Sequence, residues 1–177
     1  MLIEIPIDNE IDSQLARIAT NVRTLVTDSR ILAKSSSCIH AAAVSVFALE
    51  ELVKYQCLKE ARKSAVAAGK PRLEVDGHIF GFGRKAHDFK LNLAKTWKLI
   101  PDDAWEVHDA PFAAPAFGSP AFDVQRVLDA QLRLESIFVD YDRTKNLWSS
   151  PPMIDADKLE NSNNEILKAL GKVESNT

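Results

Sequence analysis

Residues 38–68, CIHAAAVSVFALEELVKYQCLKEARKSAVAA, are the stretch that decides the fold class of this chain. On an α-helix, with about 100° between neighbouring residues, small and apolar side chains form a stripe along one side of it. The stripe consists of Ile39, Ala42, Ala43, Val46, Leu49, Val53 and Cys57. Because Phe47, Leu52 and Leu58 lie well off this stripe, the middle of the helix is apolar nearly all round. We expect the helix to lie inside a helical bundle.

The segments on either side of this central helix also have clear boundaries. Residues 8–34 carry apolar side chains at steps of three and four, which predicts an amphipathic helix with Asp8 or Asn9 as its N-cap. Residues 35–37, three consecutive serines, interrupt the pattern and are expected to cap the central helix. Gly69-Lys70-Pro71 then ends that helix.

Three further helices are predicted later in the chain. The third runs from about Gly83 to Leu99, and its expected core stripe is Phe82, Ala86, Phe89, Leu93, Trp97 and Ile100. The fourth begins with Ser119-Pro120, a favourable N-cap and first helical position, and ends near Asp142. A weaker amphipathic helix closes the chain, with Leu159, Ile166 and Leu170 on its apolar side.

Two segments do not fit a helix. Residues 72–80 contain an Asp76-Gly77 turn signal between apolar residues, which predicts a small hairpin flap. Residues 101–120 contain four prolines and several aromatic residues, which predicts a long loop. The expected fold class is all-α, an antiparallel bundle of four to five main helices. We expect one domain, in which residues 1–152 form the bundle and residues 153–177 add a helix and a polar tail.

Composition narrows the function classes. Hydrophobic residues make up 46% of the chain and charged residues 27%, with a formal net charge of −3, as in ordinary soluble proteins. No global positive field attracts nucleic acid, so RNA contact would need a local basic cluster. No apolar run reaches the ~18 residues of a membrane span, and the acidic N-terminus lacks the basic region of a signal peptide. We expect a cytoplasmic protein without membrane contact.

The two cysteines agree with a reducing compartment. Cys38 and Cys57 fall on one predicted helix, where a rise of ~1.5 Å per residue separates them by about 28 Å. A disulfide needs Cα atoms within roughly 7 Å of each other. We therefore expect two buried thiols rather than a bridge.

One turn of the central helix carries a charged residue at a position where a helical bundle is expected to have an apolar one. Glu50 projects within the apolar stripe, between Val46 and Val53, and a buried carboxylate is costly unless it is paired. Lys54 is its nearest local partner, and Glu51 lies beside them. The turn is either a structural ion pair that orients neighbouring helices or part of a functional site.

A second cluster lies at the start of the third predicted helix. Arg84, His87 and Lys90 follow each other at steps of three, so they share a sector beside the apolar stripe. Cations with a titratable imidazole near a helix N-terminus can hold a phosphate or a scissile RNA linkage. A solvated basic face is the alternative.

Other motifs carry less weight. The run from Gly81 to Ala86 fits the loose dinucleotide pattern G-x-G-x-x-A, but that fingerprint needs a βαβ unit and helices surround it here. The four histidines show no metal-ligand spacing, and no carboxylate or cysteine cluster accompanies them. We expect neither a cofactor nor a metal.

The order of several short motifs resembles the AbiV-type abortive infection family of HEPN proteins. The carriers are Ala48–Lys54 (ALEELVK), His87–Leu91 (HDFKL) and Phe138–Asp142 (FVDYD), followed by Trp148 and Pro151. These landmarks extend over residues 35–152. The resemblance implies a HEPN-like helical bundle, an antiviral role against phage and a tendency to form homodimers.

One departure from the wider HEPN pattern bears on activity. Many HEPN ribonucleases carry an Arg and a His separated by four to six residues, whereas only two residues separate Arg84 from His87 here.

The first hypothesis is a toxin that halts the infected cell by acting on RNA without a metal. His87 would transfer protons, Arg84 and Lys90 would hold the phosphate, and Glu50, Glu51 and Lys54 would orient them.

The second hypothesis is a non-enzymatic, protein-binding helical module. The charged motifs would then hold the helices together, while the loop at residues 101–120 docks a phage or host protein regulator. Exposed aromatic residues in such a loop suit protein contacts, and here they are Trp105, Phe112 and Phe117.

Overall fold

The computed structural model describes residues 2–81, 84–105, 141–142, 147–148 and 154–175. Within these ranges lie four α-helices: α1 (Asn9–Lys34), α2 (Cys38–Ala67), α3 (Arg84–Thr96) and α5 (Ala156–Ser175). Two short 3-10 helices, η1 (Gly77–Phe80) and η2 (Asp102–Trp105), flank α3. The predicted all-α class is confirmed. No helix among these residues is both long and apolar enough to cross a membrane.

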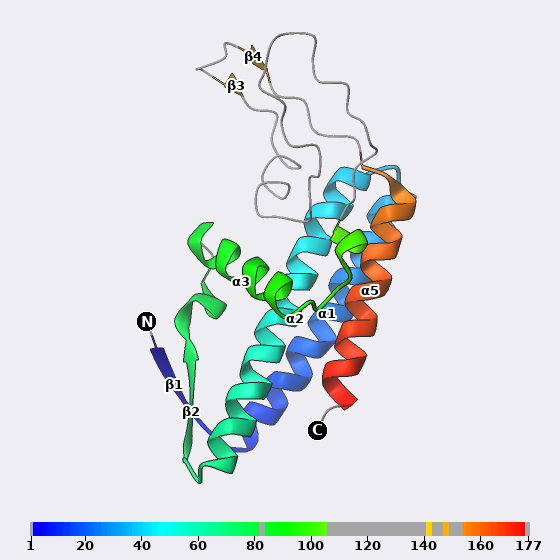
Figure 1. Cartoon of the computed structure of the whole chain (residues 1–177). Helices are drawn as coiled ribbons and strands as arrows, with labels where there is room; N and C mark the ends of the chain where they lie inside the picture. Colours follow the sequence, from blue (N-terminus) through cyan, green and yellow to red (C-terminus); the bar gives the residue numbers. More distant parts are fainter. Residues whose placement is uncertain (1, 82–83, 106–140, 143–146, 149–153, 176–177) are drawn as a thin grey trace.

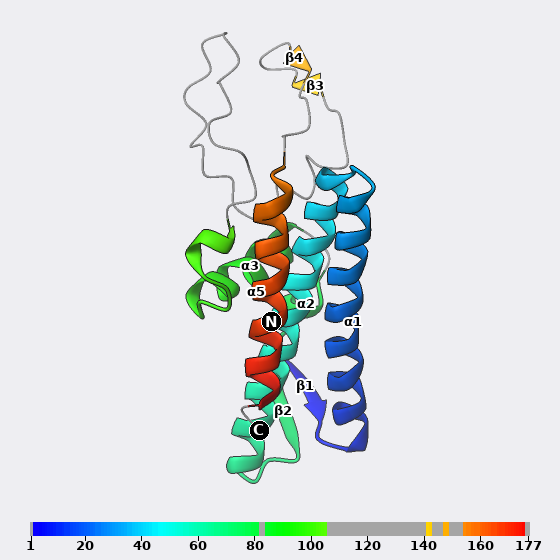
Figure 2. The same cartoon turned by 90° about the vertical axis from the view of Figure 1, so that its right-hand side faces the viewer.

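The helix α2 is the centre of the bundle. Figures 1 and 2 show α1, α2 and α5 side by side as long rods, with α1 antiparallel to the other two. The shorter α3 lies against a different side of α2, which also contacts strand β2 (Arg72–Asp76). Val46, Leu49 and Leu52 of α2 are completely buried. The all-round apolar pattern predicted this central position correctly.

The start of α1 confirms the predicted capping residue. The Asp8 carboxylate accepts hydrogen bonds from the backbone N–H groups of Glu10 and Ile11, at 2.9 and 3.3 Å. These bonds satisfy donors that the first helical turn leaves without partners. Ser37 is the N-cap of α2, but its hydroxyl is hydrogen-bonded to the His40 ring rather than to a backbone N–H. The serine run therefore separates the two helices without a side-chain cap.

The predicted hairpin at residues 72–80 is wrong in its pairing. Strand β2 forms where a strand was expected, but its antiparallel partner is β1 (Leu2–Pro6), with Ile3 opposite Val75. After β2 the chain turns into η1, because the Asp76 carboxylate accepts the His78 backbone N–H at 2.9 Å and caps that turn. The Asp-Gly signal marked a helix start instead of a hairpin turn.

The predicted core stripe of α3 also needs correction. The helix ends at Thr96, so Trp97 lies beyond it and is 39% exposed. His87 and Lys90, expected on a sector beside the stripe, are instead buried together with Ala86, Leu91 and Ala94. A polar side chain can occupy a buried face when a partner on another helix compensates it, and periodicity within one helix does not report that partner.

Several predictions concern residues outside the described ranges. These include residues 106–120 of the proline-rich loop and residues 119–140 of the fourth helix. Its expected last residues, Tyr141 and Asp142, form strand β3, which pairs with β4 (Leu147–Trp148), so a helix reaching Asp142 is wrong. Trp105, expected to be exposed in the loop, is 4% exposed, and the Lys95 ammonium lies 5.2 Å from its ring.

The closing helix α5 is held to the bundle by apolar and polar contacts. Its predicted apolar residues Leu159, Ile166 and Leu170 are buried. Asn163 forms a closed triangle of hydrogen bonds of 2.7 to 3.0 Å with the Ser29 and Ser45 hydroxyls, linking α5, α1 and α2. Both cysteines are free thiols, as their predicted separation required, but they are half-buried rather than buried.

Candidate functional site

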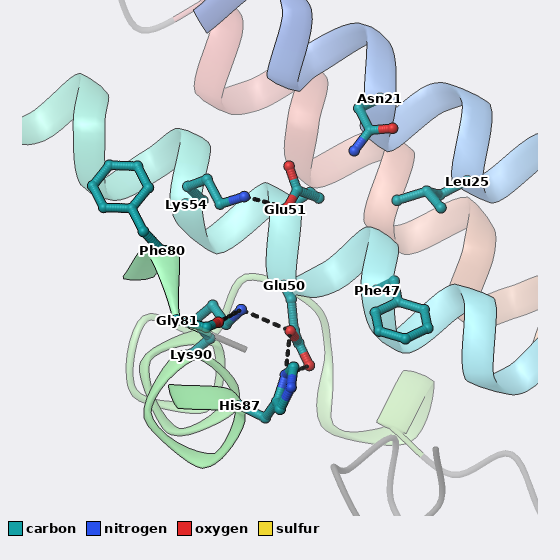
Figure 3. A pocket seen from close by; sticks show the side chains of 10 residues that line it. All are labelled: Asn21, Leu25, Phe47, Glu50, Glu51, Lys54, Phe80, Gly81, His87 and Lys90. Carbon is teal, nitrogen blue, oxygen red and sulfur yellow. Dashed lines mark hydrogen bonds and ion pairs between the residues drawn. The ribbon is translucent and has the colours of Figure 1, made fainter. Parts of the chain in front are cut away.

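The first feature of the site is a buried carboxylate on α2. Glu50 points from α2 toward α3, where its oxygens lie 2.6 and 2.7 Å from Nδ1 of His87 (Figure 3). The Lys90 ammonium lies 2.8 Å from the same carboxylate. All three side chains are buried, with 3 to 4% of their surface exposed. Helical spacing explains the arrangement, because His87 and Lys90 are three residues apart on one face of α3.

The partner predicted for Glu50 was wrong. Lys54 pairs with Glu51, three residues before it on the same helix, and both side chains are about one fifth exposed. The Glu50 carboxylate extends away from this pair to reach α3 (Figure 3). An acid and a base at adjacent turns favour a local pair only when no stronger tertiary partner is available. The His87 ring and the Lys90 ammonium of α3 outcompete Lys54 for Glu50.

Gly81 fixes how closely the start of α3 approaches the cluster. The Lys90 ammonium also donates a hydrogen bond to the Gly81 carbonyl, at 3.3 Å. A Cβ placed on Gly81 would lie 2.6 Å from the Cβ of Ala86, closer than real Cβ contacts. The glycine is therefore explained by tight packing at the entry to α3 and not by a dinucleotide fingerprint.

Electrostatics make the three buried groups interdependent. Removing a carboxylate and an ammonium from water costs several kcal/mol each, and only close pairing with hydrogen bonds offsets that cost. With neutral His87, the formal charges of Glu50 and Lys90 cancel. Glu50 also fixes the orientation of the imidazole through Nδ1, in the way that a carboxylate orients many functional histidines.

The cluster lies at the wall of a pocket of about 310 Å³ between α1, α2, η1 and α3 (Figure 3). The lining residues are Asn21, Leu25, Phe47, Glu50, Glu51, Lys54, Phe80, Gly81, His87 and Lys90. Five of the six residues predicted for the site, all except Arg84, therefore line one cavity. This juxtaposition of the α2 and α3 motifs is the one on which both sequence hypotheses depended.

Arg84, the sixth predicted residue, is the first residue of α3. Its side chain lies outside the described part of the structure, so its predicted contact with a phosphate stays a prediction. Within the described ranges, no three His, Cys, Asp or Glu residues are grouped closely enough to hold a metal ion.

Sequence reasoning missed the pocket residues that carry no charge. Asn21 and Leu25 come from α1, Phe47 from α2 and Phe80 from the end of η1. Phe47 gave a usable signal, since it lies off the main apolar stripe of its helix. Phe80 was assigned to the hairpin, and Asn21 is one polar residue among many on the exposed side of α1.

One titratable group close to β2 has a strongly shifted pKa. Burial, together with the nearby Asp76 carboxylate, raises the pKa of the Cys57 thiol to about 11. Hydrogen bonds from the backbone and ring of His78 lower the pKa of Asp76 itself. Neither residue lines the pocket, so these shifts concern the scaffold around it.

Comparison with known proteins agrees with the motifs. No curated protein and no solved structure matches the chain significantly. Residues 10–171, nearly the whole sequence, match the family model described as AbiV, of the HEPN class. The match extends over α1, α2, α3 and α5, and so over every helix that borders the pocket. The chain therefore belongs to the AbiV family of HEPN proteins.

Proposed function

We propose that this protein is an anti-phage abortive infection effector that acts on RNA at the pocket between α2 and α3. The antiviral role follows from membership of the AbiV family. The observation that carries the site is the meeting of Glu50, His87 and Lys90 at the pocket wall. A carboxylate that orients an imidazole next to an ammonium is suited to proton transfer beside a phosphate.

In the proposed reaction, His87 acts on the 2′-hydroxyl of a ribonucleotide. Because Nδ1 faces Glu50, the proton would pass through Nε2. The 2′-oxygen forms a bond to phosphorus as the bond from phosphorus to the 5′-oxygen breaks. The imidazolium then returns its proton to that 5′-oxygen, so the step needs neither a metal nor a cofactor. The products are a 2′,3′-cyclic phosphate and a free 5′-hydroxyl.

The remaining predicted residues act on the phosphate. Lys90 and Lys54 both line the pocket, and their ammonium groups would donate hydrogen bonds to the phosphate oxygens on which negative charge develops. Glu51 holds the Lys54 ammonium in place through their ion pair. Arg84 would add a further cation at the N-terminus of α3, where the helix dipole also favours an anion.

An RNA cleavage assay tests this proposal. The purified protein is incubated with single-stranded RNA in the presence of a chelator, and the products are examined for 2′,3′-cyclic phosphate ends. His87→Ala should lose cleavage by at least ~100-fold, as expected for removal of a general acid–base group. His40→Ala removes an exposed histidine outside the pocket and should cleave like the wild type. Equal cleavage by wild type and His87→Ala would exclude His87 from the mechanism.

A second function has its own support in the same geometry. His87 and Lys90 are only 3 and 4% exposed, as expected of residues that hold two helices together. In that case the protein is a non-enzymatic module that binds a phage or host protein regulator. Melting curves separate the two functions: if His87→Gln folds normally yet no longer arrests phage-infected cells, the cluster is a site. If it unfolds, the cluster is scaffold.

A homodimer forms part of the proposal. The HEPN resemblance implies self-association, and a dimer could bring two such pockets to one RNA strand. Sedimentation equilibrium of the purified chain checks it, and a single species of about 19.6 kDa at micromolar concentration would exclude the dimer.

A further inference from the structure

We infer that the pocket selects one unpaired nucleotide of single-stranded RNA, with Phe80 stacking on the base and Asn21 reading its edge. This inference rests on the proposed action on RNA and specifies the substrate for that same site. It follows from four properties of the pocket: its charge balance, its size, the exposed aromatic ring at its rim and the amide on its opposite wall.

Charge balance excludes recognition through the phosphate backbone alone. Among the lining residues, Glu50 and Glu51 cancel the charges of Lys54 and Lys90, and each acid is already paired with a lysine. Binding of duplex nucleic acid depends mainly on many uncompensated cations that displace counterions from phosphates. A neutral pocket therefore needs contacts to the base to gain affinity. Such contacts are accessible in single strands, whose bases can leave the stack.

The volume of the pocket also favours a single unpaired nucleotide as its ligand. About 310 Å³ is at the lower end of the range for pockets that enclose small molecules. A partly open pocket of this size can take one nucleotide but not a segment of double helix. His87, in the wall of the same space, would then lie next to the sugar and phosphate of the nucleotide whose base is held.

Phe80 provides the stacking surface. It is the last residue of η1 and is 36% exposed, one of few large apolar side chains in the described part of the chain that face solvent to this degree. Figure 3 places its ring at one end of the lining residues, beside Lys54, with Phe47 at the other end. Stacking of a base on an aromatic ring is a main source of affinity for single strands. An exposed ring beside a cation is well placed for it.

Asn21 provides the hydrogen-bonding edge. It lies on α1, across the pocket from α3, and its side chain is exposed and forms no hydrogen bond within the described ranges. An amide has both donors and an acceptor, so it can pair with the edge of a base in the way that Asn pairs with adenine. Leu25, one helical turn further along α1, and Phe47 of α2 add apolar surface around the same space.

Equilibrium binding tests the inference. Fluorescence anisotropy measures the Kd of a labelled single-stranded RNA with 2′-O-methyl groups, which lacks the attacking hydroxyl, and of the same strand annealed to its complement. The single strand should bind at least 10-fold more tightly. Phe80→Ala should weaken its binding roughly 5- to 150-fold. Phe80→Leu, which keeps apolar volume but removes the ring, should show most of that loss.

Two matched variants provide controls. Trp97→Leu removes another aromatic ring, 39% exposed, that does not line the pocket, and should leave the Kd within 2-fold of wild type. Asn21→Ala should reduce discrimination among the four homopolymers at least 3-fold, whereas Thr20→Ala, an exposed neighbour on α1, should not.

The outcomes separate this inference from the proposed function. If RNA is cleaved but Phe80→Leu and Asn21→Ala behave like wild type, or duplex binds as tightly as single strand, the inference is wrong and the function stands. If the single strand binds through Phe80 but no RNA is cleaved, the inference stands and the cleavage mechanism fails. If no RNA binds at all, both are overturned.

Discussion

Two buried polar clusters lie five residues apart on α2, and in each of them buried polar groups are satisfied by partners from neighbouring helices, but the partners differ in kind. Around Ser45, the Ser29 hydroxyl and the Asn163 amide close a neutral triangle between α1, α2 and α5. Around Glu50, the His87 ring and the Lys90 ammonium of α3 form a cluster that contains an ion pair. Both clusters satisfy polar groups inside the bundle, but the Glu50 cluster lines the pocket described above, and the three residues of the triangle do not.

This difference is the basis on which we propose that the Glu50 cluster serves a ligand and the triangle serves the fold. A closed triangle of uncharged groups fixes how three helices pack, and none of its groups carries a charge or titrates near neutral pH. Two hydroxyls and an amide achieve this without the cost of burying ions. Burying charged groups only to fix the packing of helices would cost more free energy than burying neutral ones. The presence of charged groups next to an open space is what we interpret as a site.

The largest expected effect comes from removing the acid of the charged cluster. Glu50→Ala leaves the Lys90 ammonium buried without its carboxylate, which should lower the free energy of unfolding by about 3–5 kcal/mol. Glu51→Ala, one residue away in a partly exposed pair, should cost less than about 1 kcal/mol. Urea denaturation measures both. A similar small loss in the two variants would show that Glu50 is not the electrostatic centre of the cluster.

The next effect concerns the approach of α3 to that cluster. Gly81→Ala would place a Cβ 2.6 Å from the Cβ of Ala86, so the entry to α3 must shift, at a cost of about 2 kcal/mol. Gly171→Ala is the matched control, because nothing lies within 4 Å of its Cβ position on α5. It should stabilise the protein by up to ~1 kcal/mol through helix propensity.

RNA cleavage by the same two variants, Gly81→Ala and Gly171→Ala, gives a second test of the role of Gly81. Because the Gly81 carbonyl also accepts the Lys90 ammonium, Gly81→Ala should reduce RNA cleavage more than its stability loss explains at 25 °C. Gly171→Ala should cleave like the wild type. Full cleavage by a folded Gly81→Ala would mean that the position of the first turn of α3 is unimportant for the reaction.

Features of the fold that depend on local sequence could be predicted, whereas features that depend on contacts between distant segments could not. The bounds of α1 and α2, and the presence of α5, were predictable because each is long and strongly periodic, with Asp8 as a clear cap. The partner of β2 was not, since β1 lies some 70 residues earlier and a nearby Asp-Gly pair offered a plausible local turn.

The charged motifs of the candidate site could be predicted from the sequence, but their contacts with one another could not. The two motifs that meet at the pocket could be identified from Glu50 on an apolar stripe and from the cations of α3. Their pairing could not, because Lys54 satisfies the spacing rule for Glu50 and nothing local indicates that His87 and Lys90 face inward. Tertiary packing decided the partner.

A smaller effect is expected from the neutral triangle. Asn163→Ala removes two buried hydrogen bonds and should cost about 1–3 kcal/mol. Asn164→Ala, whose side chain accepts only an exposed bond from Arg30 in the described ranges, should cost less than about 1 kcal/mol. Asn163→Ala should keep its cleavage rate per folded molecule, unlike Gly81→Ala. A selective loss of cleavage in Asn163→Ala would mean that the triangle also serves the site.

At neutral pH the smallest effect comes from Cys57, a half-buried thiol on α2. Burial raises the pKa of the Cys57 thiol from its ordinary value of 9.0 to about 11, so the folded protein favours the neutral thiol. Between pH 9 and pH 11 the unfolded chain releases this proton while the folded chain keeps it. The thiol's contribution to stability is therefore complete below pH 9 and is lost as the pH rises toward 11.

Comparison of variants isolates this contribution from the other groups that titrate at alkaline pH. Tyr55, whose pKa burial also raises, is present in wild type and in Cys57→Ala alike, so it cancels in the difference. The free energy of unfolding should fall less steeply between pH 9 and pH 11 in Cys57→Ala than in wild type, and Cys38→Ala should follow the wild type. Identical slopes would show that Cys57 is solvated, in contrast to Glu50, whose burial is offset by two partners from α3.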